Sequence, residues 1–303
     1  MSEFILHHYP TSPISEKIRV VMGIKKLTWR SVQIPNLPPK PDVIPLSGGY
    51  RRTPIMQIGA DIFCDSQTIL AEIENQYPTN MKNAGLVQVI NHWCDNLFAP
   101  IVKVAIATSS SRFPEDFLKD RQALFLGAYP DMDSVTRRIP HYTTQVRAQM
   151  SWANAALHDS GGFLLGEAPS VPDASLFALV WFIRRRWENG EEFLTEFPDI
   201  CRWEKAITDI GHGTYDEMTS QEALDVANNS DIAPENNGAD SDDQIFSKGN
   251  YVRISFDGKS GEQPVSGRIH SLERNRISLI HTNDRVGTVC IHFPKVGYLI
   301  EHL

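Results

Sequence analysis

Apolar and polar positions along the first fifty residues predict a strand, a helix and a second strand. The run from Phe4 to Leu6 is apolar and stops before Pro10, as expected of a short strand. Ser12 and Pro13 then suit the N-cap and the first position of a helix. Residues 28–34 predict the second strand, and the proline- and glycine-rich stretch 35–49 predicts a loop. Apolar positions at helical spacing mark the helix between them: Ile14, Ile18, Val21 and Met22.

Residues 52–78 predict two further strands and another helix. The two strands flank a tight turn at residues 59–61. The helix is predicted to begin near Ser66, to carry Ile69, Leu70 and Ile73 on one face, and to end at Pro78. The first eighty residues therefore have the order β-α-β followed by β-β-α.

Residues 84–226 read as helices without strand-like alternation, which predicts an all-helical domain. The stretch Ser170 to Asp173 has the spacing of a capping box, with the Ser170 hydroxyl expected to bond to the N–H of Asp173. The helix that follows is apolar nearly all round between Leu176 and Ile183, so we expect it to be buried at the centre of the domain. This pattern predicts a structural role for Asp173.

The last quarter of the chain has a different pattern. Residues 228–243 carry five acidic and no basic side chains, which predicts an acidic linker. Five short alternating segments follow within about 55 residues and predict a small β-barrel or β-sandwich. The sequence thus predicts an α/β domain over residues 1–83, an all-α domain over 84–227, a linker over 228–245 and a small β-rich domain over 246–303.

Composition and charge restrict the possible functions. The 303 residues carry a net charge of −8, and the middle of the chain (residues 84–245) holds 25 of the 37 acidic side chains. This charge and the lack of an interleaved basic and aromatic stripe argue against nucleic-acid binding. The four cysteines form no CxxC pair and no metal-ligand spacing, so we expect no metal and a reducing, cytoplasmic location. Neither an N-terminal targeting pattern nor an apolar run long enough to span a membrane is present.

Three short motifs in the first eighty residues resemble the glutathione transferase family. They are Ser12-Pro13-x-Ser15-x-Lys17-Ile18-Arg19 after the first strand, Thr53-Pro54-Ile55 at the third strand, and Asp65-Ser66 at the last helix. Their order and spacing are similar to those of the thioredoxin-like N-terminal domain of that family. The resemblance extends over about residues 3–226 and leaves the C-terminal β-rich segment outside it.

This resemblance implies a glutathione site. Pro54 would follow a cis peptide bond, and the backbone of Thr53 would pair with the cysteinyl unit of glutathione. Ser66 and the free N–H groups of its helix would hold the γ-glutamyl carboxylate, and Asp65 would accept from the ammonium. In any other protein, Asp65 and Ser66 could serve as helix caps alone. For the glycine carboxylate, Arg52 is included in the expected site, with Lys40 and Arg51 as alternatives that the sequence does not separate.

A glutathione transferase must ionise the thiol of its substrate. A thiol with a pKa near ~8.5 is only about 3% ionised at pH 7, and lowering the pKa to ~6.5 raises that fraction to roughly three quarters. Ser12 stands where a hydroxyl donor and a helix N-terminus would both favour the anion, and it matches the position of the catalytic residue in serine-type members. Tyr9 is the alternative, Ser15 is a weaker one, and Ser12 could also be a simple N-cap.

The resulting hypothesis is a glutathione-dependent enzyme that attacks a small apolar electrophile by conjugation, isomerisation or dehalogenation. The family resemblance also implies a homodimer, with glutathione as co-substrate, and the short apolar runs predict no membrane partner. A second hypothesis is a non-catalytic binding or scaffold protein with the C-terminal β domain as its interaction module.

Overall fold

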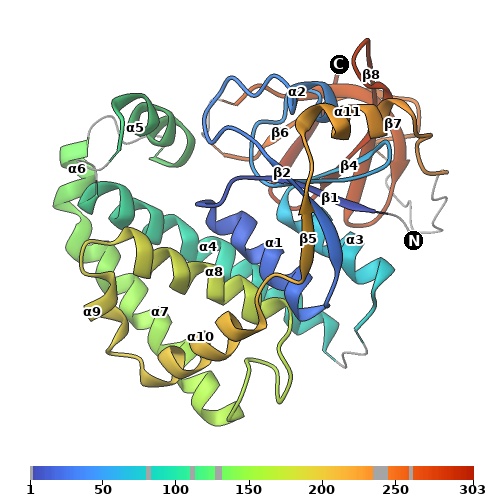
Figure 1. Ribbon diagram of the computed structural model, residues 1–303. Coiled ribbons are helices and arrows are strands. Elements are labelled where there is room, and N and C mark those ends of the chain that lie inside the picture. Colours follow the sequence, from blue (N-terminus) through green and yellow to red (C-terminus); the bar gives the residue numbers. More distant parts are fainter. Residues whose placement is uncertain (1–2, 80–82, 110–112, 127–131, 235–244, 259–261) are drawn as a thin grey trace.

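The computed structural model describes residues 3–79, 83–109, 113–126, 132–234, 245–258 and 262–303, and it contains three packed parts (Figure 1). The first part has the predicted order of elements. Its strands are β1 (Phe4–His8), β2 (Thr28–Gln33), β3 (Ile55–Ile58) and β4 (Asp61–Cys64), and its helices are α1 (Pro13–Ile24), α2 (Ile44–Ser47) and α3 (Ser66–Gln76). β1 is parallel to β2 and antiparallel to β3, which pairs in turn with β4. The short helix α2 lies within the segment that the sequence predicted to be a loop.

The second part is a bundle of helices that packs against α1. At its centre lies α8 (Val171–Arg186), which is buried over most of its length, as predicted. Its capping box is present, and Asp173 is fully buried. The other members are α4 (Ala84–Thr108), α5 (Glu115–Arg121), η2 (Gln122–Leu126), α6 (Met132–Arg137), α7 (Ile139–Ser160), α9 (Gly190–Leu194) and α10 (Pro198–Ile210).

One expectation for this region was wrong. The strand β5 (Thr214–Glu217) interrupts the segment that was expected to be helical throughout, and it pairs in parallel with β2. All four of its residues are exposed, so the strand has no apolar alternation that a sequence could show. Backbone hydrogen bonds to the open edge of β2 hold it in place instead. The helix α11 (Ser220–Asn228) follows.

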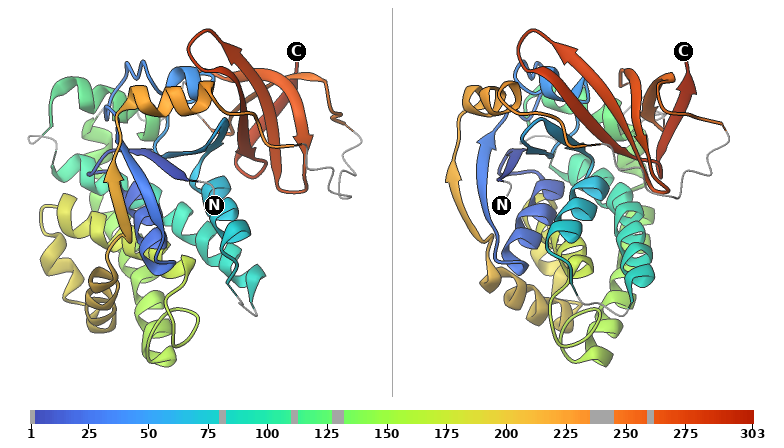
Figure 2. Two further views of the ribbon diagram at one scale, coloured as in Figure 1. Left: turned by 45° about the vertical axis from the view of Figure 1, so that its right-hand side comes forward. Right: turned by 90° about the vertical axis from the view of Figure 1, so that its right-hand side faces the viewer.

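The C-terminal strands continue the sheet of the first part. They are β6 (Tyr251–Phe256), β7 (Val265–Leu272), β8 (Arg276–Asn283), β9 (Gly287–Pro294) and β10 (Tyr298–His302), close to the predicted segments. Because β9 pairs in parallel with β4, one ten-stranded sheet runs in the order β10-β6-β7-β8-β9-β4-β3-β1-β2-β5. The strands therefore extend the first domain in place of the separate small barrel or sandwich that was expected. Figure 2 shows this β domain beside β4 and away from the helical bundle.

Two hydrophobic cores hold the molecule together. The larger one joins the helical bundle to α1, α3 and one face of the N-terminal sheet. The second contains Ile5, Ile55 and Ile62 of the first part together with Ala223 and Leu224 of α11. The same core includes apolar residues of the C-terminal strands: Val252, Ile254, Val265, Ile269, Ile277, Leu279, Val289, Ile291 and Phe293. The β domain thus shares a core with the N-terminal domain.

Candidate functional site

The strand register brings the three sequence motifs to one end of the sheet. His7 at the end of β1 pairs with Ile55 at the start of β3, and Ile55 pairs with Cys64 at the end of β4. The chain leaves β1 toward α1, enters β3 and leaves β4 toward α3 at this same end. The N-termini of α1 and α3, each with its partial positive charge, therefore lie close to the start of β3.

Ser12 and Tyr9 lie in the connection from β1 to α1. Ser12 is the N-cap of α1, and its hydroxyl oxygen accepts a hydrogen bond from the Ser15 N–H at 3.1 Å. Ser12 is 2% exposed, and this bond leaves its hydroxyl proton for a further acceptor. Tyr9 is half-buried, and its phenol oxygen accepts a long hydrogen bond of 3.4 Å from Arg121 of α5.

Thr53 and Pro54 directly precede β3, and the peptide bond between them is cis, as expected. The hydroxyl of Thr53 accepts from the Lys40 ammonium at 2.6 Å, and Lys40 also donates to the carbonyl of Arg51 at 2.9 Å. Lys40 is buried, and burial together with the cations Arg121 and Arg51 lowers its pKa to about 7. A cation that loses its charge near neutral pH therefore stands beside Thr53.

Asp65 and Ser66 open α3. The backbone of Asp65 has a φ of 75°, in the left-handed region, and its Oδ1 accepts from the N–H of Gln67 at 2.9 Å. Its Oδ2 accepts from the hydroxyl of Tyr298 in β10 at 3.0 Å. Burial raises the pKa of Asp65. Asp65 is thus a helix cap that also has a second oxygen directed at the C-terminal β domain.

The three basic candidates for a glycine carboxylate point in different directions. Arg51 pairs with Asp120 of α5 at 2.6 Å, on the side of the helical bundle. Arg52 turns to the β domain, where two of its nitrogens bind the carboxylate of Glu262 at 2.6–3.1 Å. Its guanidinium carbon also lies 3.7 Å from the centre of the Phe256 ring.

Sequence reasoning missed the side chains that reach this end of the sheet from a distance. Tyr298 and Glu262 come from the β domain, and Arg121 and Asp120 come from α5. Tyr298 reads only as one more aromatic residue in an alternating strand, so no local signal could have identified its contact with Asp65.

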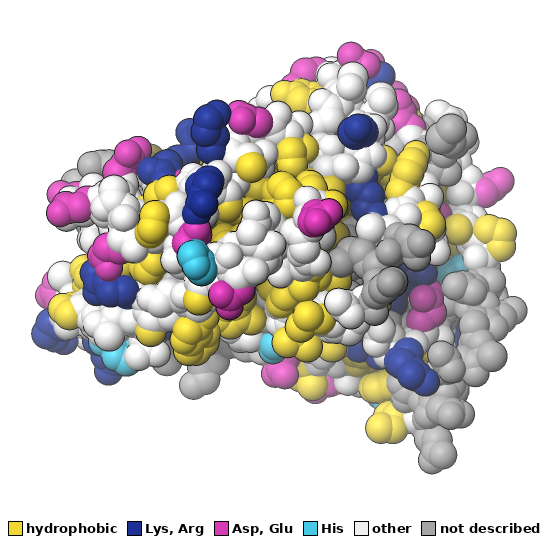
Figure 3. Space-filling view, turned by 90° about the horizontal axis from the view of Figure 1, so that it is seen from below, with side chains coloured by type: hydrophobic (Ala, Val, Ile, Leu, Met, Phe, Trp, Pro, Cys, Tyr) yellow, Lys and Arg dark blue, Asp and Glu magenta, His cyan; other side chains and the backbone are white. Residues whose placement is uncertain are grey.

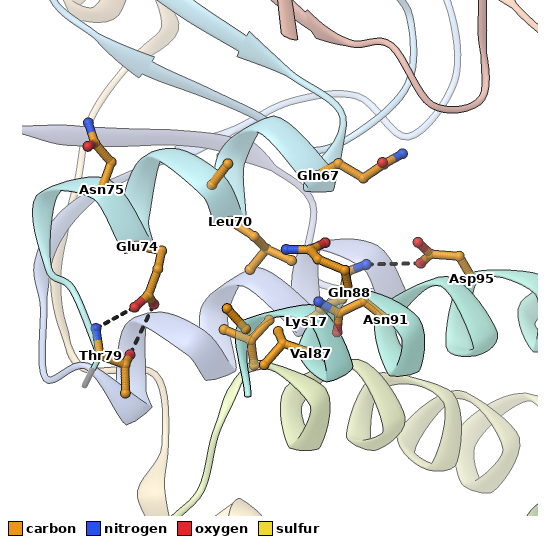
Figure 4. Close-up of a pocket in the computed structure, with 13 residues that line it drawn as sticks. Lys17, Gln67, Leu70, Glu74, Asn75, Thr79, Val87, Gln88, Asn91 and Asp95 are labelled. Carbon is orange, nitrogen blue, oxygen red and sulfur yellow. Dashed lines mark hydrogen bonds and ion pairs between the residues drawn. The ribbon is translucent and has the colours of Figure 1, made fainter. Parts of the chain in front are cut away.

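A cavity of about 300 Å³ lies beside this site, between α3 and α4 (Figure 4). Its walls include Leu70, Val87 and Gln88, and Lys17 lies at its inner side with its ammonium 3.1 Å from Asp95. Gln67, which lines one end, follows Ser66 directly, so the cavity adjoins the start of α3. A much smaller space of about 20 Å³ lies where Arg52, Glu262 and Tyr298 meet, which is room for about one water molecule.

A buried polar chain crosses the boundary between β4 and the β domain. Ser271 donates to Ser278, the Ser278 hydroxyl bonds to His292 Nδ1 at 2.7 Å, and His292 Nε2 bonds to Asp61 at 2.9 Å. Although this order of groups is that of a serine nucleophile with its base, Ser278 is fully buried and a substrate could not reach it.

The same boundary holds a group of possible metal ligands among the described residues: Asp61, Cys290 and His292, with donor atoms within 4.8 Å of one another. Both ring nitrogens of His292 have hydrogen-bond partners, and burial raises the pKa of the Cys290 thiol. A protonated thiol and a fully bonded imidazole do not favour a metal, so we treat these residues as a structural contact between the two parts.

Comparison with known proteins defines the class. Residues 6–81 match the model of the glutathione S-transferase N-terminal domain, and residues 136–206 match the model of its C-terminal domain. No curated protein matches the sequence significantly. A GST-like protein from Pseudomonas syringae, known from a crystal structure, is 29% identical, covers 100% of both chains and has a TM-score of 0.77.

Other solved structures share only the fold. Glutathione transferase GSTFuA3 from Phanerochaete chrysosporium is 17% identical with a TM-score of 0.53, and the match covers 69% of this chain and 98% of the GSTFuA3 chain. Poplar glutathione transferase F1 is 13% identical with a TM-score of 0.54, and the match covers 69% of this chain and 94% of the poplar chain. The chain therefore has a glutathione S-transferase-like fold with added C-terminal β strands, and the P. syringae protein matches it along its full length. Within the described residues, every helix is too short or too polar to cross a membrane.

Proposed function

We propose that the protein binds glutathione at the end of the sheet described above and activates its thiol for attack on a small apolar electrophile. The observation that carries this proposal is the convergence of the N-termini of α1 and α3, with Ser12 on one and Asp65 and Ser66 on the other. Such a place favours the two anions of the ligand, its thiolate and its γ-glutamyl carboxylate.

Each residue has a distinct role in this proposal. Ser66 and the N–H groups of α3 hold the γ-glutamyl carboxylate, and Asp65 accepts from the adjacent ammonium. The backbone of Thr53 aligns the cysteinyl unit. The Ser12 hydroxyl donates to the thiolate, while Lys40 or Arg51 holds the glycine carboxylate.

The energy required is modest. Lowering the pKa of the bound thiol from ~8.5 to ~6.5 corresponds to about 2.7 kcal/mol. A charge-assisted hydrogen bond contributes about 1.5–3 kcal/mol and a helix N-terminus about 0.3–1 kcal/mol, so Ser12 and α1 together suffice.

The first test is a calorimetric titration with reduced glutathione, followed by the thiolate absorbance of the bound ligand against pH. We expect Ser12→Ala to bind glutathione but to return the thiol pKa toward ~8.5 and to lower kcat by about 100-fold. Tyr9→Phe is the matched control and should keep both values. If Tyr9→Phe instead loses the thiolate signal, Tyr9 is the activating residue, and if the wild type binds no glutathione, the proposed function is wrong.

One observation favours the alternative of a non-catalytic binding protein. Arg52, one of the residues expected at the glutathione site, is engaged by Glu262 and Phe256 of the β domain. A protein that binds glutathione but does not turn over a panel of aryl halides, epoxides and activated alkenes would fit this alternative. Turnover that depends on Ser12 would exclude it.

We also propose that the protein is a homodimer, as the family resemblance implies, and that it is cytoplasmic. Leu86 and Val89 on α4 are 45% and 63% exposed and flank Val87 and Gln88, which line the cavity, and a partner subunit could cover them. Figure 3 shows that apolar side chains gather between charged ones on the face seen from below. All four cysteines are free thiols, which is consistent with a reducing compartment. Light scattering after gel filtration tests the dimer.

A further inference from the structure

The C-terminal β domain reaches into the proposed glutathione site through Tyr298. This residue begins β10 and is 9% exposed. Its hydroxyl lies 3.0 Å from Asp65 Oδ2 and 3.2 Å from the hydroxyl of Tyr50. Tyr298 and Asp65 are 233 residues apart in the sequence.

The number of protons determines the direction of these hydrogen bonds. A phenol has one proton, and an ionised carboxylate has none to donate. Tyr298 therefore donates to Asp65, and Tyr50 donates to Tyr298. Two buried phenols are therefore hydrogen-bonded in series, and the second one donates to Asp65 Oδ2. The N–H of Gln67 bonds to the other oxygen, Oδ1.

We propose that Tyr298 is a positioning residue that keeps Asp65 ionised and oriented to receive the ammonium of the γ-glutamyl group. This inference rests on the proposed function, because it assigns the role of the β domain at that same site. The β domain then forms part of the ligand site, and catalysis by the first two domains alone would be impaired.

Two further contacts fix Tyr298 relative to α3. The side-chain amide of Gln67 donates to the carbonyl of Val296 at 3.3 Å, two residues before Tyr298. The Arg52–Glu262 ion pair also joins the segment before β3 to the loop between β6 and β7. The parallel pairing of β4 with β9 also joins the β domain to the strand that leads into α3. Tyr298 is thus held in register with Asp65 by the surrounding backbone.

The groups around Asp65 raise or lower its pKa, so its ionisation depends on the hydrogen-bond donors that face it. Burial raises its pKa, and the carboxylate of Asp95 on α4 raises it further, whereas Lys17 on α1 lowers it. The Gln67 N–H and the Tyr298 hydroxyl also lower it by bonding to the charged form. Tyr50 and Tyr298 themselves remain neutral phenols, since burial raises the pKa of both. Asp65 also raises the pKa of the Cys64 thiol on β4, and Arg52 before β3 lowers the pKa values of Tyr50 and Tyr298.

The test compares Tyr298→Phe with Tyr251→Phe, which removes a phenol hydroxyl from an exposed position of the same β domain. Glutathione binding is measured by calorimetry from pH 4 to pH 8 in the full-length protein. We expect Tyr298→Phe to weaken binding about tenfold and to move the acid limb of the binding curve up by about one pH unit. Tyr50→Phe should have a smaller effect, because the Tyr298 donor remains, and Tyr251→Phe should match the wild type.

A second measurement separates this inference from the proposed function. The pKa of the Asp65 carboxyl is read by carbon NMR in the ligand-free wild type and in Tyr298→Phe, with thermal melting as a check on folding. An unchanged pKa, or an acid limb that does not move, overturns the role of Tyr298 even if glutathione binds. If the wild type binds no glutathione while the Asp65 pKa shifts as expected, the proposed function fails, and the assignment of Asp65 to an ammonium fails with it.

Discussion

At the scale of single residues, three buried histidines are held neutral. Burial lowers the pKa of His7 to about 4 and that of His8 to about 3, and burial also lowers the pKa of His292. Their partners agree with neutral rings, because the Arg19 guanidinium donates to His8 Nδ1 and the Ser278 hydroxyl donates to His292 Nδ1. In each of these rings one nitrogen therefore carries no proton, and the imidazole is neutral.

These histidines predict a loss of stability in mild acid. In the unfolded chain a histidine takes up a proton below pH ~6.5, whereas the folded protein resists it until the lowered pKa. The free energy of unfolding should therefore fall as the pH drops from about 6.5 to 4, by about 3 kcal/mol from His7 alone. Urea unfolding at a series of pH values measures the slope.

Carboxylates also contribute to acid unfolding, so the comparison must be made between variants. His7→Gln should show a shallower slope than the wild type, even if it is less stable at pH 7. His158→Gln, at a position where the side chain is 74% exposed, should keep the wild-type slope. If the free energy of unfolding has the same slope against pH in all three proteins, His7 is not held neutral by burial.

At the scale of elements, the start of α8 shows how a local motif acquires tertiary partners. Asp173 Oδ2 accepts from the N–H and the hydroxyl of Ser170, which completes the capping box. Its Oδ1 accepts from the N–H of Leu164 and from the indole of Trp203 on α10. The capping residue thus joins three segments of the helical bundle.

Asp173→Asn should destabilise the protein by more than about 3 kcal/mol. The variant loses the charge that four donors share and turns an amide toward some of them, which leaves buried groups unsatisfied. Chemical unfolding measures the change, with Asp209→Asn as the control, because Asp209 is exposed on α10. A loss of less than about 1 kcal/mol would contradict the structural role of Asp173.

At the scale of the whole molecule, the β domain and the N-terminal domain form one unit. The sheet runs without a break from β9 to β4, and the second hydrophobic core contains residues from both sides of that boundary. The chain of Ser278, His292 and Asp61 adds buried polar contacts there, and Asp61 also accepts from the N–H of Ala233. A fragment that ends before residue 246 would leave these groups exposed.

We therefore expect a chain cut within residues 235–244 to remain one particle. A protease site inserted in that segment should yield two fragments that elute together and melt in a single transition, because the shared core and sheet persist. Gel filtration before and after cleavage measures this, and the uncut protein with the same insertion is the control. Separation of the fragments in the absence of denaturant would show that the β domain is an independent module.

The sequence by itself determined the order of the elements in the first eighty residues, the helical character of most of residues 84–226, the C-terminal strands and the family resemblance. Local periodicity, a proline or serine at a helix start and a glycine at a turn are enough to predict α1, the capping box of α8 and the strands β6 to β10. They also place Ser12, Thr53 and Asp65 in motifs whose meeting at one end of a sheet follows from the order of the strands.

Tertiary structure alone decided what surrounds those residues. The exposed strand β5 and the pairing of β9 with β4 depend on open sheet edges, and an edge has no signature in the sequence of the strand that will cover it. The direction of Arg52 toward Glu262 and the contact of Tyr298 with Asp65 depend on that pairing. Side chains more than 200 residues apart meet only when the backbone register between distant strands is set, so the role of the β domain could be inferred only from the folded molecule.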